Sequence, residues 1–199
     1  MKTRLLLSTL LVLAAASAGH ASIVWSGPVN LPVPFTFDGL YLNPCTGATA
    51  ATQPADWNTA PWINPFFGGV YIGNDALLRP VIIGADQVVN LGAGVTISAA
   101  RTFVAGESGS TTHVGPSAQQ FQLGTPGYLG FAFEPATGGA THYGWVQITI
   151  RNTGAGTIHD WAYDDAAGTG IPAGAVPEPG SALLLGLGAA AWAVRRRRK

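Results

Sequence analysis

The sequence contains few of the residues that most often carry chemistry or hold a charged partner. Cys45 is its single cysteine, so no disulfide can form within the chain, and stability must come from burial and backbone pairing. Only 10% of the residues are charged. Residues 22–175 contain three arginines against nine carboxylates, a net charge of −6. A body of that charge repels phosphate backbones, which argues against a nucleic-acid partner.

Motifs for catalysis are missing as well. Ser108 lies near His113, but the string around it lacks the Gly-x-Ser-x-Gly spacing that places a nucleophile on a sharp turn. Cys45 has no basic residue or histidine close in sequence to lower its pKa, so we expect a small buried thiol; a nucleophile and an intermolecular bridge are the alternatives. The Gly-Ala-Gly string at 92–94 lacks the third glycine of a dinucleotide site. We therefore predict that the chain is not an enzyme and binds no cofactor.

The sequence also offers no spaced set of metal ligands. The histidines of the body stand singly, without the paired spacing of a zinc site; they are His113, His142 and His159. We expect each to be a polar side chain with satisfied hydrogen bonds. Three aspartates lie close enough to offer oxygens to calcium, but they do not match the D-x-D-x-D-G loop; they are Asp160, Asp164 and Asp165. We expect a solvated acidic rim there and predict no metal site.

Residues 22–175 show the pattern of one all-β domain. No stretch has a sustained 3.6-residue apolar period, and Gly, Pro and Asn interrupt the sequence every few positions. We predict an antiparallel β-sandwich of jelly-roll or lectin-like type. Strands are expected at residues 23–25, 35–37, 40–42, 70–72, 78–83, 88–91, 95–99, 121–123, 128–133, 143–150 and 157–163.

The clearest unit is an antiparallel meander at residues 128–163. Side chains alternate along its first two strands, and Gly-rich turns separate its three strands. The alternation places Val146 and Ile148 on one face and Tyr143 and Trp145 on the other. We expect Trp145 and Trp161 to pack across neighbouring strands in the core.

The segment 43–65 differs from the rest of the body, because it is rich in Ala, Thr, Pro and Asn. We predict a long surface loop, ordered by the two tryptophans near its end. Aromatic rings at a surface can stack on sugars. The candidate ligand-stacking residues of a carbohydrate-binding domain are therefore Trp57, Trp62 and Trp145.

The first 21 residues have the order of a secretory signal peptide. Lys2 and Arg4 precede a run of apolar and small residues from 5 to 18. Small residues suited to signal peptidase lie before Ser22, and we expect cleavage there rather than before Gly19. A retained N-terminal membrane anchor is the alternative, although the run is short for a membrane span.

Residues 176–199 contain a second hydrophobic segment. Residues 181–194 carry no charge, and the segment is bounded by Pro177, Glu178 and Pro179 before it and by Arg195, Arg196, Arg197, Arg198 and Lys199 after it. Fourteen residues reach only about 21 Å against a hydrocarbon core of roughly 30 Å, a gap that snorkelling arginines and local thinning partly cover. Because cations beside a span stay in the cytoplasm, we predict a transmembrane helix with the body outside.

This order of tripeptide, short apolar helix and arginine cluster resembles the PEP-CTERM sorting signal of Gram-negative bacteria. In that family the tripeptide marks the site for an exosortase, a membrane-embedded transpeptidase-like protease that removes the tail and releases the protein toward the surface or the exopolysaccharide matrix. The resemblance implies that the sorting signal comprises Pro177, Glu178, Pro179 and Arg195 to Arg198. A generic tail anchor and a short type I membrane protein are the alternatives.

Parts of the body also resemble segments of many uncharacterised PEP-CTERM proteins, at residues 23–27, 38–43, 142–147 and 160–163, but this likeness implies no activity. The predicted division is a signal peptide (1–21), a β-sandwich domain (22–175) and a sorting signal (176–199). The expected partners are signal peptidase, exosortase, the inner membrane in transit and envelope polysaccharide. We predict a non-catalytic structural or binding protein of the cell surface or biofilm matrix, with a carbohydrate-binding module and a secreted hydrolase as alternatives.

Overall fold

The computed structural model describes residues 22–104, 108–110 and 113–177, and the regular secondary structure there is almost entirely β-strand, joined by turns and bends. The strands are β1 (Ile23–Trp25), β2 (Leu31–Val33), β3 (Tyr41–Leu42), β4 (Thr49–Ala50), β5 (Ile63–Phe66), β6 (Tyr71–Asn74), β7 (Leu78–Pro80), β8 (Ile82–Ile83), β9 (Gln87–Val88), β10 (Asn90–Leu91), β11 (Thr96–Ile97), β12 (Ser108–Ser110), β13 (Pro126–Phe133), β14 (His142–Thr149), β15 (Gly156–Asp164) and β16 (Ile171–Pro172). A 3₁₀ turn, η2 (Phe67–Gly69), joins β5 to β6.

Within those three ranges, no helix has the length and apolar character needed to cross a membrane. The predicted signal helix at 1–21 and the predicted transmembrane helix at 181–194 lie outside the described residues.

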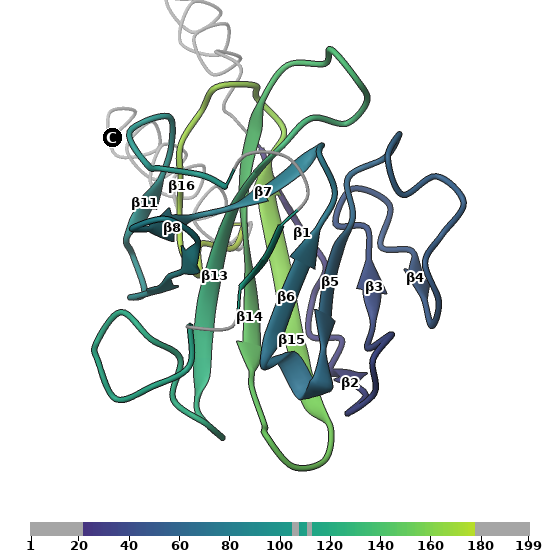
Figure 1. The fold of residues 1–199 in the computed structure, drawn as a ribbon. Coiled ribbons are helices and arrows are strands. Elements are labelled where there is room, and N and C mark those ends of the chain that lie inside the picture. The colour runs from purple at the N-terminus through teal and green to yellow at the C-terminus, as the bar shows by residue number, and fades with distance from the viewer. Residues whose placement is uncertain (1–21, 105–107, 111–112, 178–199) are drawn as a thin grey trace, which may run out of the picture.

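Seven strands form the main sheet, in the order β1-β15-β14-β13-β10, with β2 also paired to β15 and β7 also paired to β13. Its centre is the antiparallel series β13, β14 and β15, the longest strands of the molecule (Figure 1). The predicted meander is therefore confirmed. Alternating side chains explain its central place, since both faces of these strands carry apolar groups that need cover.

A second sheet of five strands, β12-β6-β5-β3-β4, packs against the main sheet (Figure 1). One core cluster contains Leu42, Ile63 and Ile72 from the smaller sheet together with Phe131 and Ile148 from the main sheet. Each of these side chains is at most 2% exposed. Two antiparallel sheets thus enclose one core, and the predicted all-β antiparallel fold is confirmed.

The main sheet is buried on its other face as well. Ala132, Tyr143 and Trp145 point to that side and pack with Ile97 of β11 and Ile171 of β16. The short ladders β11–β16 and β8–β9 lie outside the two large sheets. The β11–β16 ladder forms an outer layer over this face of the central strands, whereas Ile82 of β8 and Val88 of β9 belong to the core between the two large sheets.

Trp145 and Trp161 both lie in the core, as predicted, but they do not pack on each other. The register pairs Trp145 with Ala162 and Val146 with Trp161. Neighbouring residues of a strand point to opposite faces, so the two rings lie on opposite sides of the main sheet. Trp161 belongs to the core between the sheets and Trp145 to the core under the outer layer, so the predicted contact is wrong.

Three predictions about strands and loops are wrong in whole or in part. Residues 35–37 form bends, and the strand here is the preceding β2, whose Pro32 does not prevent pairing with β15 at the sheet edge. The predicted surface loop 43–65 holds for most of residues 45–60, which form turns and bends apart from β4, and fails at its end, where β5 is buried and pairs with both β3 and β6. At 121–123 only Phe121 pairs, in an isolated bridge to Val114. The other expected strands overlap observed ones.

Candidate functional site

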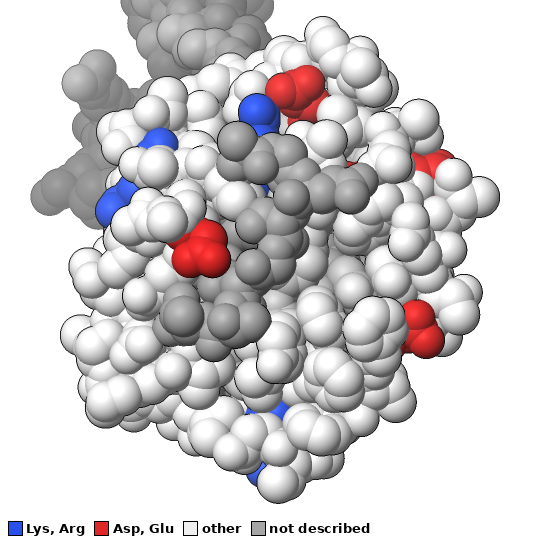
Figure 2. Space-filling model, in the orientation of Figure 1, with Lys and Arg blue, Asp and Glu red and all other residues white. Residues whose placement is uncertain are grey.

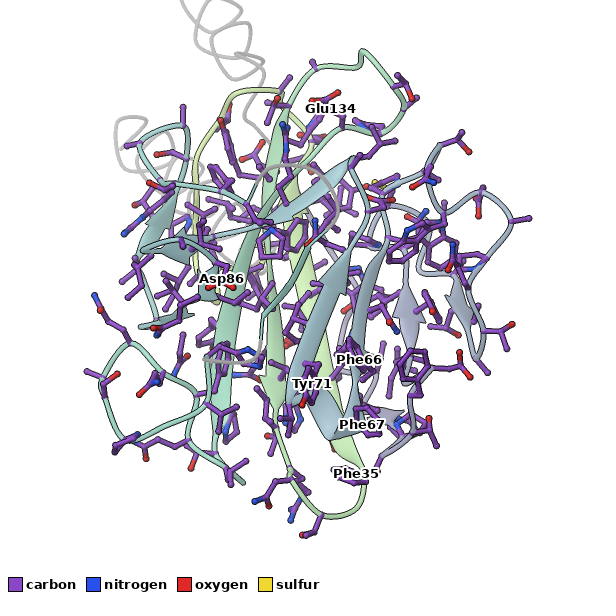
Figure 3. The ribbon with its side chains drawn as sticks, in the orientation of Figure 1. Phe35, Phe66, Phe67, Tyr71, Asp86 and Glu134 are labelled. Atoms are coloured by element: carbon purple, nitrogen blue, oxygen red, sulfur yellow. The ribbon has the colours of Figure 1, made fainter. Side chains whose placement is uncertain are left out.

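Five aromatic side chains gather where β5 turns into β6. We call this group the aromatic corner; its members are Phe35, Phe37, Phe66, Phe67 and Tyr71. The rings of Phe66 and Tyr71 are stacked, with centroids 5.1 Å apart. Phe67 makes edge contacts with Phe35 at 5.6 Å and with Tyr71 at 5.6 Å. Figure 3 labels four of these residues at one end of the molecule. The corner is thus one connected aromatic surface.

The corner lies on the outer side of the smaller sheet. Ile63 and Ile72 point into the core, and Phe66 and Tyr71 occupy positions of opposite parity on the same two strands. Phe66 and Tyr71 are also the last paired residues of the β5–β6 ladder. The sheet itself therefore directs these two rings outward, side by side.

The turn under the corner has an unusual backbone. Phe67, Gly68 and Gly69 all have positive φ angles, of 46°, 68° and 90°. A phenylalanine in that region is strained and is kept there only when surrounding contacts determine it. The Gly68 N–H donates to the Pro34 carbonyl oxygen at 3.1 Å, and the Gly68 carbonyl accepts from the Arg151 N–H at 3.0 Å. These bonds hold the Phe67 ring in place beside the other four.

The aromatic corner borders a cavity of about 340 Å³. The cavity is lined by Phe35, Phe67, Val70, Tyr71 and Asn152, none of which is charged. Its volume lies at the lower end of the range for small-molecule sites. The face of the molecule drawn in Figure 2 likewise shows few charged side chains, scattered over an uncharged surface. The site suits a small, uncharged ligand.

The chemistry of the corner is that of a stacking platform with polar groups at its edge. Phe37 is 77% exposed and Phe35 is 45% exposed, so their rings offer apolar faces to solvent. Asn152 can both donate and accept hydrogen bonds, and so can the Tyr71 hydroxyl. A pyranose matches this arrangement, because its C–H face is apolar and its rim carries hydroxyls.

The tryptophans predicted to stack on a ligand lie elsewhere. Trp145 is 1% exposed and Trp62 is 5% exposed, so neither presents a ring face to solvent, and the expectation for these two is wrong. The Trp62 indole N–H donates to Asp56 Oδ1 at 3.1 Å. Trp57 is half-buried and meets Tyr41 edge-on at 5.3 Å, and its stacking role stays a prediction.

Sequence reasoning misses the aromatic corner. The pairs Phe35/Phe37 and Phe66/Phe67 stand about thirty positions apart, and the local pattern predicts a strand for the first pair. One local signal is present: Phe66-Phe67 is followed directly by Gly68-Gly69, where two glycines permit a turn that leaves bulky rings outside. The two pairs come into contact through hydrogen bonds between segments distant in sequence, and no local sequence pattern predicts those bonds.

The body's histidines are polar residues with satisfied hydrogen bonds, as predicted. His113 is fully buried, and its Nε2 lies 3.0 Å from the Gly69 carbonyl oxygen. His142 Nδ1 lies 3.0 Å from the Asp164 carbonyl oxygen, and His159 bonds to the Thr149 hydroxyl at 2.8 Å. Throughout the part of the chain that the structure describes, no three His, Cys, Asp or Glu side chains are grouped so as to hold a metal ion.

The three neighbouring aspartates serve local structure. Asp160 Oδ2 accepts from the Trp25 indole N–H at 3.0 Å. Asp164 Oδ1 accepts from the Ala166 N–H at 2.9 Å, and Asp165 Oδ1 accepts from the Ser22 N–H at 2.7 Å. Asp164 is only 4% exposed, so the expected solvated rim is wrong for that residue.

Cys45 is half-buried and packs against the core between the sheets. Burial raises the pKa of its thiol to about 12. The thiol is therefore protonated at neutral pH, which makes it a poor nucleophile. This agrees with the expected structural role and disfavours the alternative of a catalytic cysteine.

The described part of the chain is thus an antiparallel β domain with an uncharged aromatic cavity, and its sequence continues into the predicted sorting signal. Pro177 is exposed, whereas Glu178, Pro179 and Arg195 to Arg198 lie outside the described residues. A family model described as the PEP-CTERM protein-sorting motif matches residues 175–198. The chain therefore carries this motif, which marks an exported, membrane-processed substrate of exosortase. Neither the comparison with curated proteins nor that with solved structures gave a match.

Proposed function

We propose that this protein is a non-catalytic structural or binding component of the cell surface or the exopolysaccharide matrix, to which exosortase delivers it. The observation that supports this proposal most strongly is the sorting motif at 175–198, which begins at the last residues of a folded β domain. The motif gives the export route. The finer destination, surface or matrix, is the proposal.

The chemistry of the domain supports a role without catalysis. His113 is fully buried against a backbone carbonyl, and the Cys45 thiol is protonated. The body's −6 charge and its uncharged cavity favour neutral ligands over phosphates. A jelly-roll or lectin-like topology for the two sheets stays a prediction.

A second candidate function, binding of neutral glycan, is favoured by the aromatic corner. Its cavity is large enough for a sugar ring, and three of its five lining side chains are aromatic. The corner also lies outside the smaller sheet, whereas the chain leaves for the sorting motif from the outer layer on the far side of the main sheet. A domain tethered by its tail thus keeps the corner directed away from the tether.

Processing can be tested in a host that either has or lacks exosortase. A small epitope after Lys199 reports the tail, and the body is followed with an antibody. We expect the epitope to be lost only when exosortase is present. Replacing Pro177, Glu178 and Pro179 by alanine should keep the epitope in both hosts. Equal retention of the tail in the two hosts contradicts the sorting assignment.

A further inference from the structure

The segment that joins the domain to the sorting motif is itself part of the folded domain. β16 pairs with β11 through Ile171 opposite Ile97 and Pro172 opposite Thr96. Ile171 is fully buried and Ala173 is 3% exposed, both in the core under the outer layer. No free linker precedes the motif in this stretch.

Hydrogen bonds continue past the end of β16. The Ala173 N–H donates to the Val95 carbonyl, and the Gly94 N–H donates to the Ala173 carbonyl, each at 2.9 Å. Two residues later, the Trp145 indole N–H donates to the Ala175 carbonyl oxygen at 3.2 Å. Trp145 comes from the central strand β14 and is 1% exposed, so the donor is rigidly placed. The chain is held as far as Ala175, the first residue of the matched motif.

Pro177 follows Ala175 by two residues, which span at most about 7 Å of extended chain. A protease must hold several residues on each side of the bond it cuts, in an extended conformation inside its cleft. Residues 171–175 are not available for this while they pair with β11 and Val95 and contact Trp145. The folded domain therefore covers the upstream half of any cleavage segment at Pro177-Glu178-Pro179.

We propose that the Trp145–Ala175 hydrogen bond is a latch, and that its release, with the detachment of residues 171–175, sets the rate at which exosortase processes the chain. This inference rests on the proposed delivery by exosortase. It adds that the β domain controls its own release from the membrane.

The latch is tested with Trp145→Phe, which removes the N–H donor and keeps an aromatic ring. The matched control is Trp161→Phe, because the Trp161 indole makes a similar bond, to the Pro44 carbonyl at 3.0 Å, on the opposite face of the main sheet. In the exosortase host we expect Trp145→Phe to be processed about 3- to 10-fold faster than the unmodified chain. The control should keep the original rate.

Two further measurements separate a latch from general loosening. Hydrogen exchange on the full-length precursor in detergent should speed up at the Ala173 and Ala175 amides in Trp145→Phe and not in Trp161→Phe. Insertion of about eight Gly and Ser residues between Ala175 and Val176, roughly 25 Å when extended, should accelerate processing and erase the difference between Trp145 and its Phe variant.

Equal rates in all variants, with processing intact, overturn the latch and leave the sorting assignment standing. Equal acceleration by Trp145→Phe and Trp161→Phe also overturns it, because loss of stability would then explain both. Export without processing in every variant, the spacer included, overturns the exosortase assignment and the latch together.

Discussion

Two groups of aromatic residues in this domain behave differently. In and under the main sheet, Trp145 and Trp161 are buried, and each indole N–H is bonded to a backbone carbonyl. At the aromatic corner, Phe35 and Phe37 are 45% and 77% exposed, and their rings contact other rings of the corner. Residue type alone therefore does not mark a binding ring. Burial and hydrogen bonding separate the two groups.

The difference should be largest in stability. Trp145→Ala removes a fully packed ring under the outer layer, and we expect the free energy of unfolding to fall by about 3–5 kcal/mol. Phe37→Ala should lower it by less than about 1 kcal/mol, since its ring is mostly in solvent. Denaturant titration of both variants measures this. Similar losses for the two would erase the distinction between the regions.

The next largest effect on stability is expected at η2, the strained turn under the aromatic corner. Gly68→Ala puts a Cβ into the Arg151 carbonyl oxygen at a φ of 68° and should cost about 2–3 kcal/mol. Gly84→Ala is the matched control, because Gly84 has a φ of 63° and nothing within 4 Å of an added Cβ; about 1 kcal/mol is expected there. Thermal unfolding of the two variants compares them. If they lose the same stability, contacts at Gly68 do not hold the corner.

In ligand binding, unlike in stability, the larger effect is expected at the aromatic corner. We expect the double variant Phe35→Ala/Phe37→Ala to bind purified exopolysaccharide of the producing bacterium about tenfold more weakly, a change of about 1.4 kcal/mol. Leu123→Ala is the control, because Leu123 is 44% exposed and lies outside the corner. Calorimetry or a sedimentation assay with the polysaccharide reports binding. Unchanged binding by the double variant removes the glycan role from the corner.

The smallest expected effect concerns Cys45. Its folded pKa of about 12 exceeds the ordinary value of 9.0, because the thiol is shielded from water. The unfolded chain therefore loses this proton first, so the contribution of Cys45 to stability is complete below pH 9 and is lost as the pH rises toward 12. The unmodified chain should therefore lose stability between pH 9 and pH 12 in part through this thiol. In Cys45→Ala, the free energy of unfolding measured against pH should fall less over the same range. Matching pH profiles would show that the thiol is not shielded.

Local pattern in the sequence is sufficient for the centre of the fold. The alternation along residues 128–150 predicts the meander and the face of each side chain, because period two is a property of every strand. It does not predict the register that puts Trp145 opposite Ala162, since a bulge between Gln147 and Ile148 shifts the pairing. The strand at residues 63–66 escapes prediction because Asn64 and Pro65 interrupt the apolar pattern of a strand buried by its neighbours.

The candidate site is less accessible to sequence reasoning than the fold. The aromatic corner joins residues 35–37 to 66–71 through hydrogen bonds such as Phe67 N–H to the Thr36 carbonyl, which no local pattern shows. The sorting motif, by contrast, can be recognised from local sequence. Its tripeptide, apolar run and arginines are contiguous, so the amino-acid sequence alone is enough to recognise the sorting motif, and the family model confirms it.

Export and sorting are best tested by intact-mass measurement of the protein recovered from the envelope of the producing bacterium. We expect a single species that starts at Ser22 and ends near Pro177-Glu178-Pro179, without the arginine cluster. A species that retains both Met1 and Lys199 would contradict export and sorting at once.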